Sequence, residues 1–401
     1  MSGFLPVDEQ LAKLTDGIDT LLPEDGLREL LDQQRPLRVK LGVDPTAPDV
    51  TLGWAVVFRL LRRFQDLGHI AVLIVGDFTA QVGDPSGKNQ TRRRLDAGEV
   101  GGYISQTLDT IRELLDSERL EVRPNSEWLG AMDMSDVLAL TSHFTIARIM
   151  DRDDFKKRWE EHEPISMIEF MYPLLQAMDS VAVQADIEIG GTDQLFNLMV
   201  GRDLQQNHGQ TPQVVMTVPL LVGTDGTKKM SQSLGNYISV KDQPEEMFGK
   251  TMSIPDELLE QWFVLAAGYS EAAAAAIVAE VAVGDRHPGE TKRLLAREIV
   301  SLYWGEGAAE QAEGAFDQVF RDKSVPDDIP VVALESEDDV YIPALLEAAG
   351  LVESRSEARR LIKQGAVKVA GAKAEEETIA AAALRGAVIQ VGKRRFIKVQ
   401  A

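Results

Sequence analysis

Residues 37–77 read LRVKLGVDPTAPDVTLGWAVVFRLLRRFQDLGHIAVLIVGD, and this stretch decides the fold. Two β-rich runs, 37–43 and 69–77, flank a segment at about 50–67 whose apolar residues recur at helical spacing. A strand, a helix and a second strand in this order predict two parallel strands joined by a crossover helix. Ligands bind at the carboxyl ends of such strands, so the loops after the strands are the first candidates for a site.

Three stretches rich in Gly and Asp follow strand-like runs. They are GVDPTAPD (42–49), GDFTAQVGDPSGK (76–88) and IEIGGTDQ (187–194). Any one of them alone is compatible with a simple turn. Three with the same chemistry at successive strand ends predict a ligand crevice in an α/β fold with a Rossmann-like parallel sheet.

The rest of the chain divides by pattern. We expect the parallel-sheet domain to occupy residues 1–239, with a helical insertion at about 120–185. Residues 240–325 predict a helical domain, and the prolines and acidic cluster of 326–340 predict a linker. Residues 341–401 begin with two amphipathic helices and continue with short strands, which predicts a small α+β module.

Charge is divided unevenly along this chain of 401 residues, whose net charge is −22. Residues 341–401 hold 11 Lys and Arg against 6 Glu, a net charge of +5. The first 340 residues hold 31 basic and 58 acidic residues, a net charge of −27. An acidic body would repel nucleic acid, whereas the basic module has the charge that RNA phosphates need.

Composition narrows the chemistry. The chain has no Cys, which excludes disulfides, thiolate metal sites and Cys nucleophiles. Its five His are scattered, so we expect no metal site built from His and carboxylates. The N-terminus lacks the pattern of a signal peptide and no apolar run has membrane-spanning length, so a cytoplasmic protein without membrane contact is expected.

Phosphate binding is predicted at two places, although GDPSGK lacks the spacing of a P-loop. The sequence TLGW at a helix start offers backbone N–H groups with a glycine for close approach, and DPSGK is followed by basic side chains. A third stretch, GTDGTKKMSQSLGNYI (223–238), places Lys228 and Lys229 between glycines and serines, which is compatible with a solvated turn or with a phosphate-binding loop.

Together these stretches resemble the class I aminoacyl-tRNA synthetases, and specifically the bacterial tyrosyl-tRNA synthetases. The H-x-G-H signature of that family aligns with Thr51-Leu52-Gly53-Trp54, and K-M-S-K-S aligns with residues 229–233. GDPSGK, YPLLQAMD and GGTDQ resemble its tyrosine- and ribose-binding segments. Residues 341–401 resemble the RNA-binding module named for ribosomal protein S four. The resemblance spans about residues 30–401.

The resemblance implies roles for individual residues. For tyrosine, it implies that the amino group is held by Asp84, Tyr172 and Gln176, the phenolic hydroxyl by Asp179, and a further contact by Gln194. For ATP, it implies contacts from Asp44, Thr46, Gly53, Gly191, Asp193 and Lys229. It also implies that charge on the reacting phosphates is stabilised by Thr51, Lys88, Arg92 and Lys229, together with Mg²⁺.

The helical spacing of three of these residues can be checked directly. Tyr172, Gln176 and Asp179 are separated by four and three residues, which places them on one helix face. Such a face could simply point polar groups to solvent. The residues between them do not form a separate apolar face that would be buried and place these three side chains in solvent. The pattern therefore favours a pocket.

Departures from the family pattern leave questions open. Thr51 and Trp54 stand where the family has His, Gln232 replaces the second Lys of the loop, and Lys40 stands where some tyrosyl enzymes have Tyr in the pocket wall. Trp54 could be a packing residue, a platform for ribose or adenine, or a plug that blocks ATP. A neutral Thr hydroxyl can still donate to phosphate, but more weakly than an imidazolium.

The implied function is a tyrosine–tRNA ligase that forms tyrosyl-adenylate from tyrosine and ATP and transfers it to tRNA(Tyr). The alternatives are a paralogue that binds RNA or senses an amino acid, and a ligase for a modified tyrosine. The resemblance also implies a homodimer, for which residues 135–155 offer apolar side chains. In the C-terminal module, we expect RNA to be bound by Arg355, Arg359, Arg360 and Lys363, although a solvated face has the same pattern.

Overall fold

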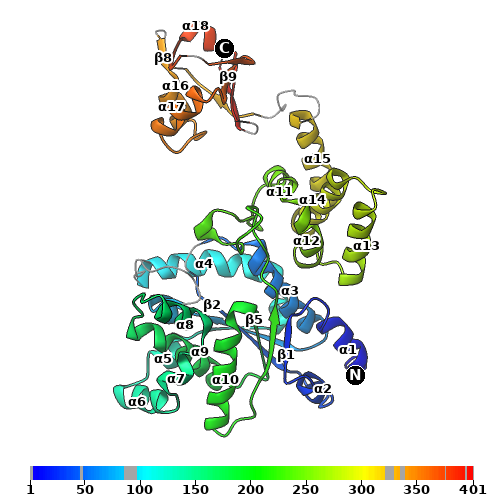
Figure 1. Cartoon of the computed structure of the whole chain (residues 1–401), viewed down its shortest axis with the longest axis vertical. Helices are drawn as coiled ribbons and strands as arrows, with labels where there is room; N and C mark the ends of the chain where they lie inside the picture. Colours follow the sequence, from blue (N-terminus) through cyan, green and yellow to red (C-terminus); the bar gives the residue numbers. More distant parts are fainter. Residues whose placement is uncertain are drawn as a thin grey trace. The chain divides into compact units, whose positions relative to one another are not determined.

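The computed structural model describes residues 3–45, 48–84, 97–320, 329–334, 339–374, 376–392 and 395–400. The chain forms two compact units, Met1–Gly305 and Glu306–Ala401, which are treated separately below. Figure 1 shows the elements of each unit.

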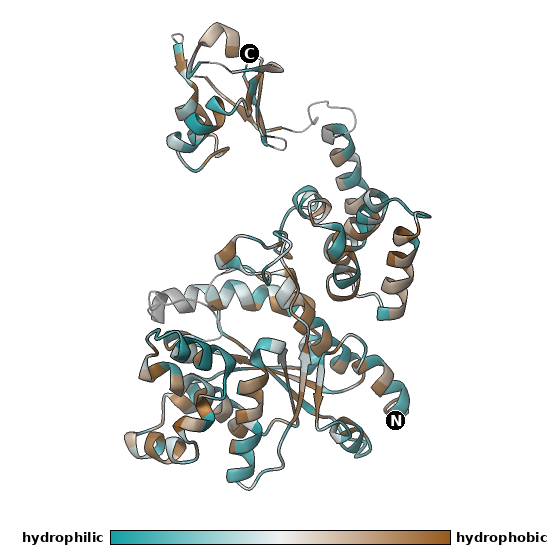
Figure 2. Ribbon diagram, in the orientation of Figure 1, coloured by the Kyte–Doolittle hydropathy of each residue, from teal (hydrophilic) through white to brown (hydrophobic). Residues whose placement is uncertain are grey.

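The first unit is built on a six-stranded sheet in the order β1-β6-β5-β2-β3-β4. Its strands are β1 (Thr20–Leu22), β2 (Arg38–Val43), β3 (Ile70–Val75), β4 (Leu120–Pro124), β5 (Ile187–Gly191) and β6 (Val214–Val218). All neighbours are parallel except β1, which runs antiparallel to β6. The inner strands are hydrophobic in Figure 2, as expected for a sheet covered on both faces.

The helices of this α/β unit separate its strands along the chain. They are α1 (Val7–Leu14), α2 (Gly26–Leu31), α3 (Leu52–Asp66), α4 (Ala97–Leu114), α5 (Ser126–Leu129), α6 (Met134–Ser142), α7 (Ile146–Ile149), α8 (Asp153–Glu160), α9 (Met167–Val183) and α10 (Leu195–Asn207). The chain moves one way from β2 to β4 and the other way from β4 to β6. Right-handed crossovers therefore place α3 and α4 on one face and α9 and α10 on the other.

Local sequence explains where the two site helices begin. Thr51 caps α3, and its side-chain oxygen accepts the backbone N–H of Trp54 at 3.3 Å. Ser166 and Glu169 form a capping box at the start of α9. On α9, Leu174 and Ala177 pack against Val200 and Leu204 of α10, which fixes the rotation of α9 about its axis. The predicted strands and the helix at 50–67 agree with β2, α3 and β3 to within a few residues.

Helices continue after β6, as predicted for the segment beyond residue 240. They are α11 (Pro244–Met252), α12 (Leu259–Leu265), α13 (Glu271–Ala282) and α14 (Pro288–Trp304) in the first unit, and α15 (Glu306–Phe320) in the second. The unit boundary at Gly305 lies inside the predicted helical domain. Trp262 of α12 is fully buried and its indole N–H donates to the Val222 carbonyl at 3.1 Å, which anchors α12 to the end of the sheet.

The second unit is α+β. Besides α15 it has α16 (Ile342–Ala348), α17 (Arg355–Lys363) and α18 (Ala381–Leu384), with strands β7 (Val331–Val332), β8 (Asp339–Tyr341), β9 (Val367–Val369), β10 (Ala372–Lys373), β11 (Thr378–Ala380), β12 (Val388–Val391) and β13 (Arg395–Val399). One sheet has the order β10-β9-β12-β13-β7, and β11 pairs with β8. The predicted linker, 326–340, thus contributes β7 and the start of β8.

Candidate active site

From β2 to β4 the strands are added on one side of β2, and β5 and β6 are added on its other side. The strand order therefore reverses at β2, between β5 and β3. Asp44 directly follows β2, and a single 3₁₀ turn, Thr192–Gln194, follows β5. Because β2 and β5 are parallel neighbours, both loops lie at the same edge of the sheet. This edge is the place where a doubly wound sheet opens a crevice for ligands.

One face of α9 contributes three side chains to this edge, as its spacing predicts. The Tyr172 hydroxyl donates to Oδ2 of Asp44 at 2.8 Å, and Oδ1 of Asp44 accepts from the Thr79 hydroxyl at 2.7 Å. A Cβ at Gly76 would lie 1.8 Å from Asp44 Oδ1, so only glycine leaves room for this carboxylate. The result is a fixed carboxylate beside the face of α9.

Asp179, about two turns beyond Tyr172 along α9, is 3% exposed. Its Oδ1 accepts the indole N–H of Trp128 at 2.9 Å, and its Oδ2 accepts from the Asn125 amide at 3.4 Å. Burial raises the pKa of Asp179 to about 7, although Lys40 and these two donors favour its charged form. The carboxyl group therefore titrates near neutral pH.

A polar network surrounds Gln176, the middle residue of the α9 face. Gln194 donates to Asp84 at 2.8 Å, and Asn197 donates to the side-chain oxygens of Gln176 and Gln194, both at 3.0 Å. Arg152 is 4% exposed and donates to Asn197 at 3.1 Å. The sequence-predicted residues Asp84, Gln176 and Gln194 are thus connected, through Asn197.

Lys40, which stands where some tyrosyl enzymes have Tyr in the pocket wall, makes its contacts inside the protein. It is fully buried, and its Nζ donates to Glu188 Oε1 at 2.8 Å, to Ser180 Oγ at 2.8 Å and to the Gln176 carbonyl at 2.9 Å. Lys40 and Glu188 are cross-strand partners in the β2–β5 register. This ion pair contacts α9 through Ser180 and Gln176, whose side-chain amide donates to Glu188 Oε1 at 3.1 Å.

The predicted nucleotide side lies at the start of α3. Thr51 is 2% exposed and caps the helix, while Trp54 is half-buried. A Cβ at Gly53 would meet Met230 Cβ and Thr51 Oγ1 at 3.5 Å, which is ordinary van der Waals contact. Packing therefore does not by itself demand glycine at position 53.

The loop that aligns with K-M-S-K-S lies beside the ribose segment. Nζ of Lys229 is 2.6 Å from Oδ2 of Asp193, so the loop cation and the predicted ribose ligand form an ion pair. Both side chains are partly exposed, at 41% and 24%. Gly191 ends β5, and Asp193 follows two residues later in the 3₁₀ turn. Thr46, Lys88 and Arg92 lie outside the described residues.

Sequence reasoning missed Thr79, Asn125, Trp128, Arg152, Glu188 and Asn197. Thr79 lies within the quoted stretch GDFTAQVGDPSGK, Glu188 lies within IEIGGTDQ, and Asn197 follows that stretch by three residues. Asn125 and Trp128 come from a segment without a motif, Arg152 comes from the segment considered for a dimer interface, and only the fold brings these three to the site. Among the described residues, no three His, Asp or Glu side chains gather in a way that could hold a metal ion.

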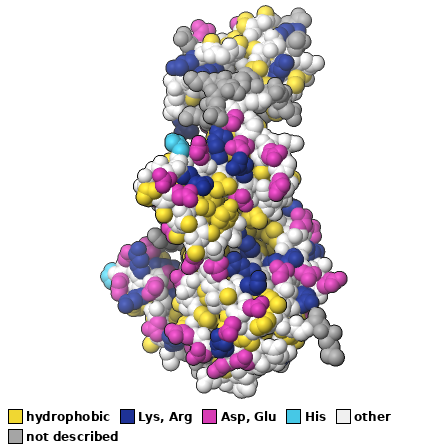
Figure 3. All heavy atoms as spheres, turned by 90° about the vertical axis from the view of Figure 1, so that its right-hand side faces the viewer, with side chains coloured by type: hydrophobic (Ala, Val, Ile, Leu, Met, Phe, Trp, Pro, Cys, Tyr) yellow, Lys and Arg dark blue, Asp and Glu magenta, His cyan; other side chains and the backbone are white. Residues whose placement is uncertain are grey.

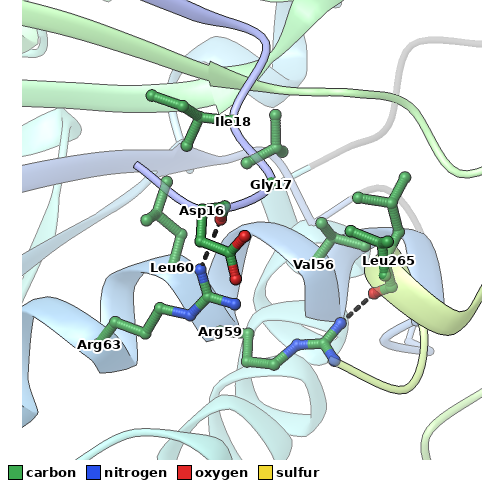
Figure 4. A pocket seen from close by; sticks show the side chains of 10 residues that line it. Asp16, Gly17, Ile18, Val56, Arg59, Leu60, Arg63 and Leu265 are labelled. Carbon is green, nitrogen blue, oxygen red and sulfur yellow. Dashed lines mark hydrogen bonds between the residues drawn. The ribbon is translucent and has the colours of Figure 1, made fainter. Parts of the chain in front are cut away.

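A small cavity beside α1 and α3 lies apart from this site. It has a volume of about 20 Å³, and its arginines donate to backbone carbonyls, Arg63 to Asp16 and Arg59 to Leu265 (Figure 4). This space holds about one water molecule, too little for an amino acid or a nucleotide. Burial lowers the pKa of Arg59.

In the second unit, the predicted RNA-binding residues are all exposed on α17. Arg355 pairs with Glu347 at 2.7 Å, whereas Arg359, Arg360 and Lys363 have no ion-pair partner within the described part of the chain. On the face of the first unit shown in Figure 3, acidic and basic side chains are interspersed. No helix among the described residues is long and apolar enough to cross a membrane.

Comparison with known proteins agrees with this geometry. Residues 32–321 match the family model of tRNA synthetases class I (W and Y), and residues 342–379 match the S4 domain. The tyrosine–tRNA ligase of Moorella thermoacetica is 47% identical over 397 residues, covering 98% of this chain and 96% of its own length. That of Mannheimia succiniciproducens is 48% identical over 389 residues, covering 97% and 98%.

Solved structures share the fold. Tyrosyl-tRNA synthetase from Archaeoglobus fulgidus, complexed with L-tyrosine, matches with a TM-score of 0.62 at 23% identity, covering 77% of this chain and 99% of its own. A C-terminally truncated mitochondrial enzyme from Aspergillus nidulans matches with 0.61 at 20% identity, covering 80% and 95%. The first unit thus has the fold of the class I synthetases. By its full-length similarity, the chain belongs to the family of bacterial tyrosine–tRNA ligases.

Proposed function

We propose that the chain activates tyrosine with ATP to form tyrosyl-adenylate and then transfers the tyrosyl group to the 3′ end of tRNA(Tyr). The observation that carries the proposal is the convergence of Asp44, Tyr172, Gln176 and Gln194 at the carboxyl ends of β2 and β5. Asp179, on the same helix α9, is held by Asn125 and Trp128, which follow β4. Fixed carboxylates and side-chain dipoles suit an ammonium group, and a buried acceptor suits a phenol.

Tyrosine is oriented by its two ends in this proposal. Asp84, Tyr172 and Gln176 hold the amino group, with Gln194 as a further contact, and Asp179 accepts the phenolic O–H. Phenylalanine would bring no donor to the buried Asp179 carboxyl and would lose the charge-assisted hydrogen bond that tyrosine makes there. The pocket thereby favours tyrosine.

Chemistry then needs no protein nucleophile. The tyrosine carboxylate attacks the α-phosphate of ATP, a P–O bond forms, and the bond to the leaving pyrophosphate breaks. The protein supplies positioning and stabilises the charge that develops on the phosphates. We assign this role to Thr51, Lys88, Arg92 and Lys229, the ribose to Gly191 and Asp193, and the remaining ATP contacts to Asp44, Thr46 and Gly53.

Mg²⁺ is proposed as a companion of the ATP phosphates, since phosphate oxygens are ligands that it prefers. In the second step, the terminal ribose hydroxyl of tRNA attacks the adenylate carbonyl and AMP leaves. Arg355, Arg359, Arg360 and Lys363 would attract the RNA backbone by charge. The proposed location is the cytoplasm, where translation takes place.

The proposed homodimer rests on exposed apolar side chains. Met134, Leu138, Ile146, Trp159 and Met167 are each more than 60% exposed, and all lie within or beside the predicted interface segment. Apolar side chains gathered on one exposed segment are typical of an interaction surface. Sedimentation at micromolar concentration should give about twice the chain mass of 44.1 kDa, and a 44.1 kDa particle would contradict the dimer.

Tyrosine-dependent exchange of pyrophosphate into ATP tests the proposed function. We expect exchange with tyrosine and none with phenylalanine. A wild-type protein without exchange, together with ATP binding gained on Trp54→Ala, would identify Trp54 as a plug and overturn the proposal. Exchange with a modified tyrosine but not with tyrosine would identify the specialised ligase.

A further inference from the structure

The loop that aligns with K-M-S-K-S has a defined shape. Met230 N–H donates to the Leu221 carbonyl at 2.8 Å, and Ser231 N–H donates to the side-chain oxygen of Asn236 at 2.9 Å. Asn236 is 4% exposed, and a Cβ at Gly223 would lie 2.3 Å from its amide nitrogen, so this turn requires glycine. The side chain of Asn236 thus forms the centre of the loop.

A second set of contacts fastens this loop to the segment before α3. The side-chain amide of Gln232 donates to the backbone carbonyl of Asp49, and the Tyr237 hydroxyl donates to Asp49 Oδ2 at 2.9 Å. Backbone bonds continue the contact, from Leu52 N–H to the Ile238 carbonyl and from Val240 N–H to the Val50 carbonyl, both at 2.9 Å. The loop and the start of α3 therefore form one joined surface.

Gln232 stands where the family signature has its second Lys. Its neutral amide is half-buried and donates to a backbone carbonyl. Three residues earlier, Lys229 lies beside Asp193, and Met230 packs over Gly53. A tether at Gln232 thus limits where the Lys229 ammonium can be.

We propose that Gln232 is a positioning residue that fastens the signature loop to Asp49 and thereby places Lys229 at the nucleotide site. The inference rests on the proposed function, since it assumes that Lys229 contacts ATP. In this proposal, the neutral side chain of Gln232 holds the loop at Asp49, whereas the family signature has a cationic Lys at this position.

Gln232→Met tests this, because Met has similar length but neither donor nor charge. One neutral hydrogen bond is worth roughly three- to tenfold in an equilibrium. In the ligand-free protein, we expect amide hydrogen exchange at Met230 and Ser231 to accelerate by roughly three- to tenfold. In pyrophosphate exchange, the KM for ATP should rise by a similar factor while the KM for tyrosine stays unchanged.

Thr227→Ala is the matched control, because Thr227 is exposed in the same loop and only its backbone N–H is bonded there. It should leave all three measurements unchanged. Unchanged amide exchange in Gln232→Met would overturn the tether, whether or not activity falls, because a direct contact with phosphate does not act in the ligand-free protein. Absence of pyrophosphate exchange in the wild type would contradict the proposed function, while amide exchange would still decide the tether.

Discussion

Nζ of Lys229 and Oδ2 of Asp193 lie 2.6 Å apart, so a loop cation and the carboxylate that follows β5 neutralise each other in the ligand-free chain. In the proposed reaction, both groups turn to ATP, Lys229 to phosphate and Asp193 to ribose. Binding of ATP therefore exchanges one ion pair for two new contacts. The exposed pair costs little to separate, because surface ion pairs are worth only about 0–1 kcal/mol.

Lys229→Ala should lower the rate of pyrophosphate exchange by about 10²-fold or more, because a preorganised cation on developing phosphate charge is lost. The KM for tyrosine should not change. Steady-state exchange kinetics with each substrate varied give both values. Lys228→Ala is the control, since its side chain has no partner among the described residues, and an equal loss in both variants would contradict a specific role for Lys229.

Tyrosine recognition should depend on pH through Asp179, whose pKa is raised to about 7. The phenol donates to the charged carboxylate, so kcat/KM for tyrosine should fall as the pH drops below 7 and level off above it. Trp128→Phe removes a donor that stabilises the charged form, so the same fall should begin at higher pH. A pH profile of kcat/KM that is flat across this range in the wild type would refute the assignment.

Asp179 also affects stability. Its pKa in the folded chain is above the unfolded value, so the folded state binds more protons between about pH 4 and 7. This group therefore lowers the free energy of unfolding as the pH rises through that window. Urea titrations should show that Asp179→Asn gains more stability relative to wild type at pH 8 than at pH 5, and the opposite trend would contradict the buried carboxyl.

Lys40→Met should destabilise the first unit by about 3–5 kcal/mol, because Glu188 would keep a buried charge without its partner. The double variant Lys40→Met, Glu188→Gln should recover most of this loss. Urea unfolding measures both. Arg62→Ala serves as the comparison, since Arg62 and Asp66 form an exposed pair that is worth at most about 1 kcal/mol. If the double variant does not recover stability, the loss comes from the missing ion pair and not from the unpaired Glu188 carboxyl.

Thr51 caps α3 and has a proposed catalytic role as a donor to phosphate, and the substitutions Thr51→Ala and Thr51→Ser remove or keep both functions together. Thr51→Ala removes the cap of α3, which costs about 0.5–2 kcal/mol, and removes the proposed donor to phosphate. Thr51→Ser keeps both. We expect Thr51→Ala to lower the exchange rate by about 10²-fold or less with unchanged tyrosine affinity, and Thr51→Ser to resemble wild type. Wild-type exchange by Thr51→Ala would remove Thr51 from the mechanism.

Truncation after Phe320 should leave adenylate formation nearly intact while charging of tRNA collapses, because the first unit contains the proposed tyrosine site and most of the second is removed. Pyrophosphate exchange and tRNA aminoacylation measure the two steps. In the full chain, reversing the charge of Arg359 and Arg360 should weaken charging and its dependence on salt. Equal loss of both activities on truncation would contradict the modular arrangement.

Sequence predicted what depends on local periodicity. The alternation around residues 37–77 gave β2, α3 and β3, and the spacing of Tyr172, Gln176 and Asp179 gave the shared face of α9. It could not predict the partner of Lys40. Glu188 is 148 residues away, and only the register of two parallel strands makes them neighbours. Arg152 was missed for the same reason, because its contacts with Asn197 cross between elements.

The buried pair behind α9 constrains any redesign of the pocket for larger tyrosine analogues. Shortening the side chain at position 40 would create space beside α9, but it would also leave the Glu188 carboxyl buried without its cationic partner. An enlarged pocket must therefore change positions 40 and 188 together, as a neutral pair, or take its space from another wall. In the proposed function, the amino-acid preference thus depends also on a buried ion pair that bonds the carbonyl and the side-chain amide of Gln176.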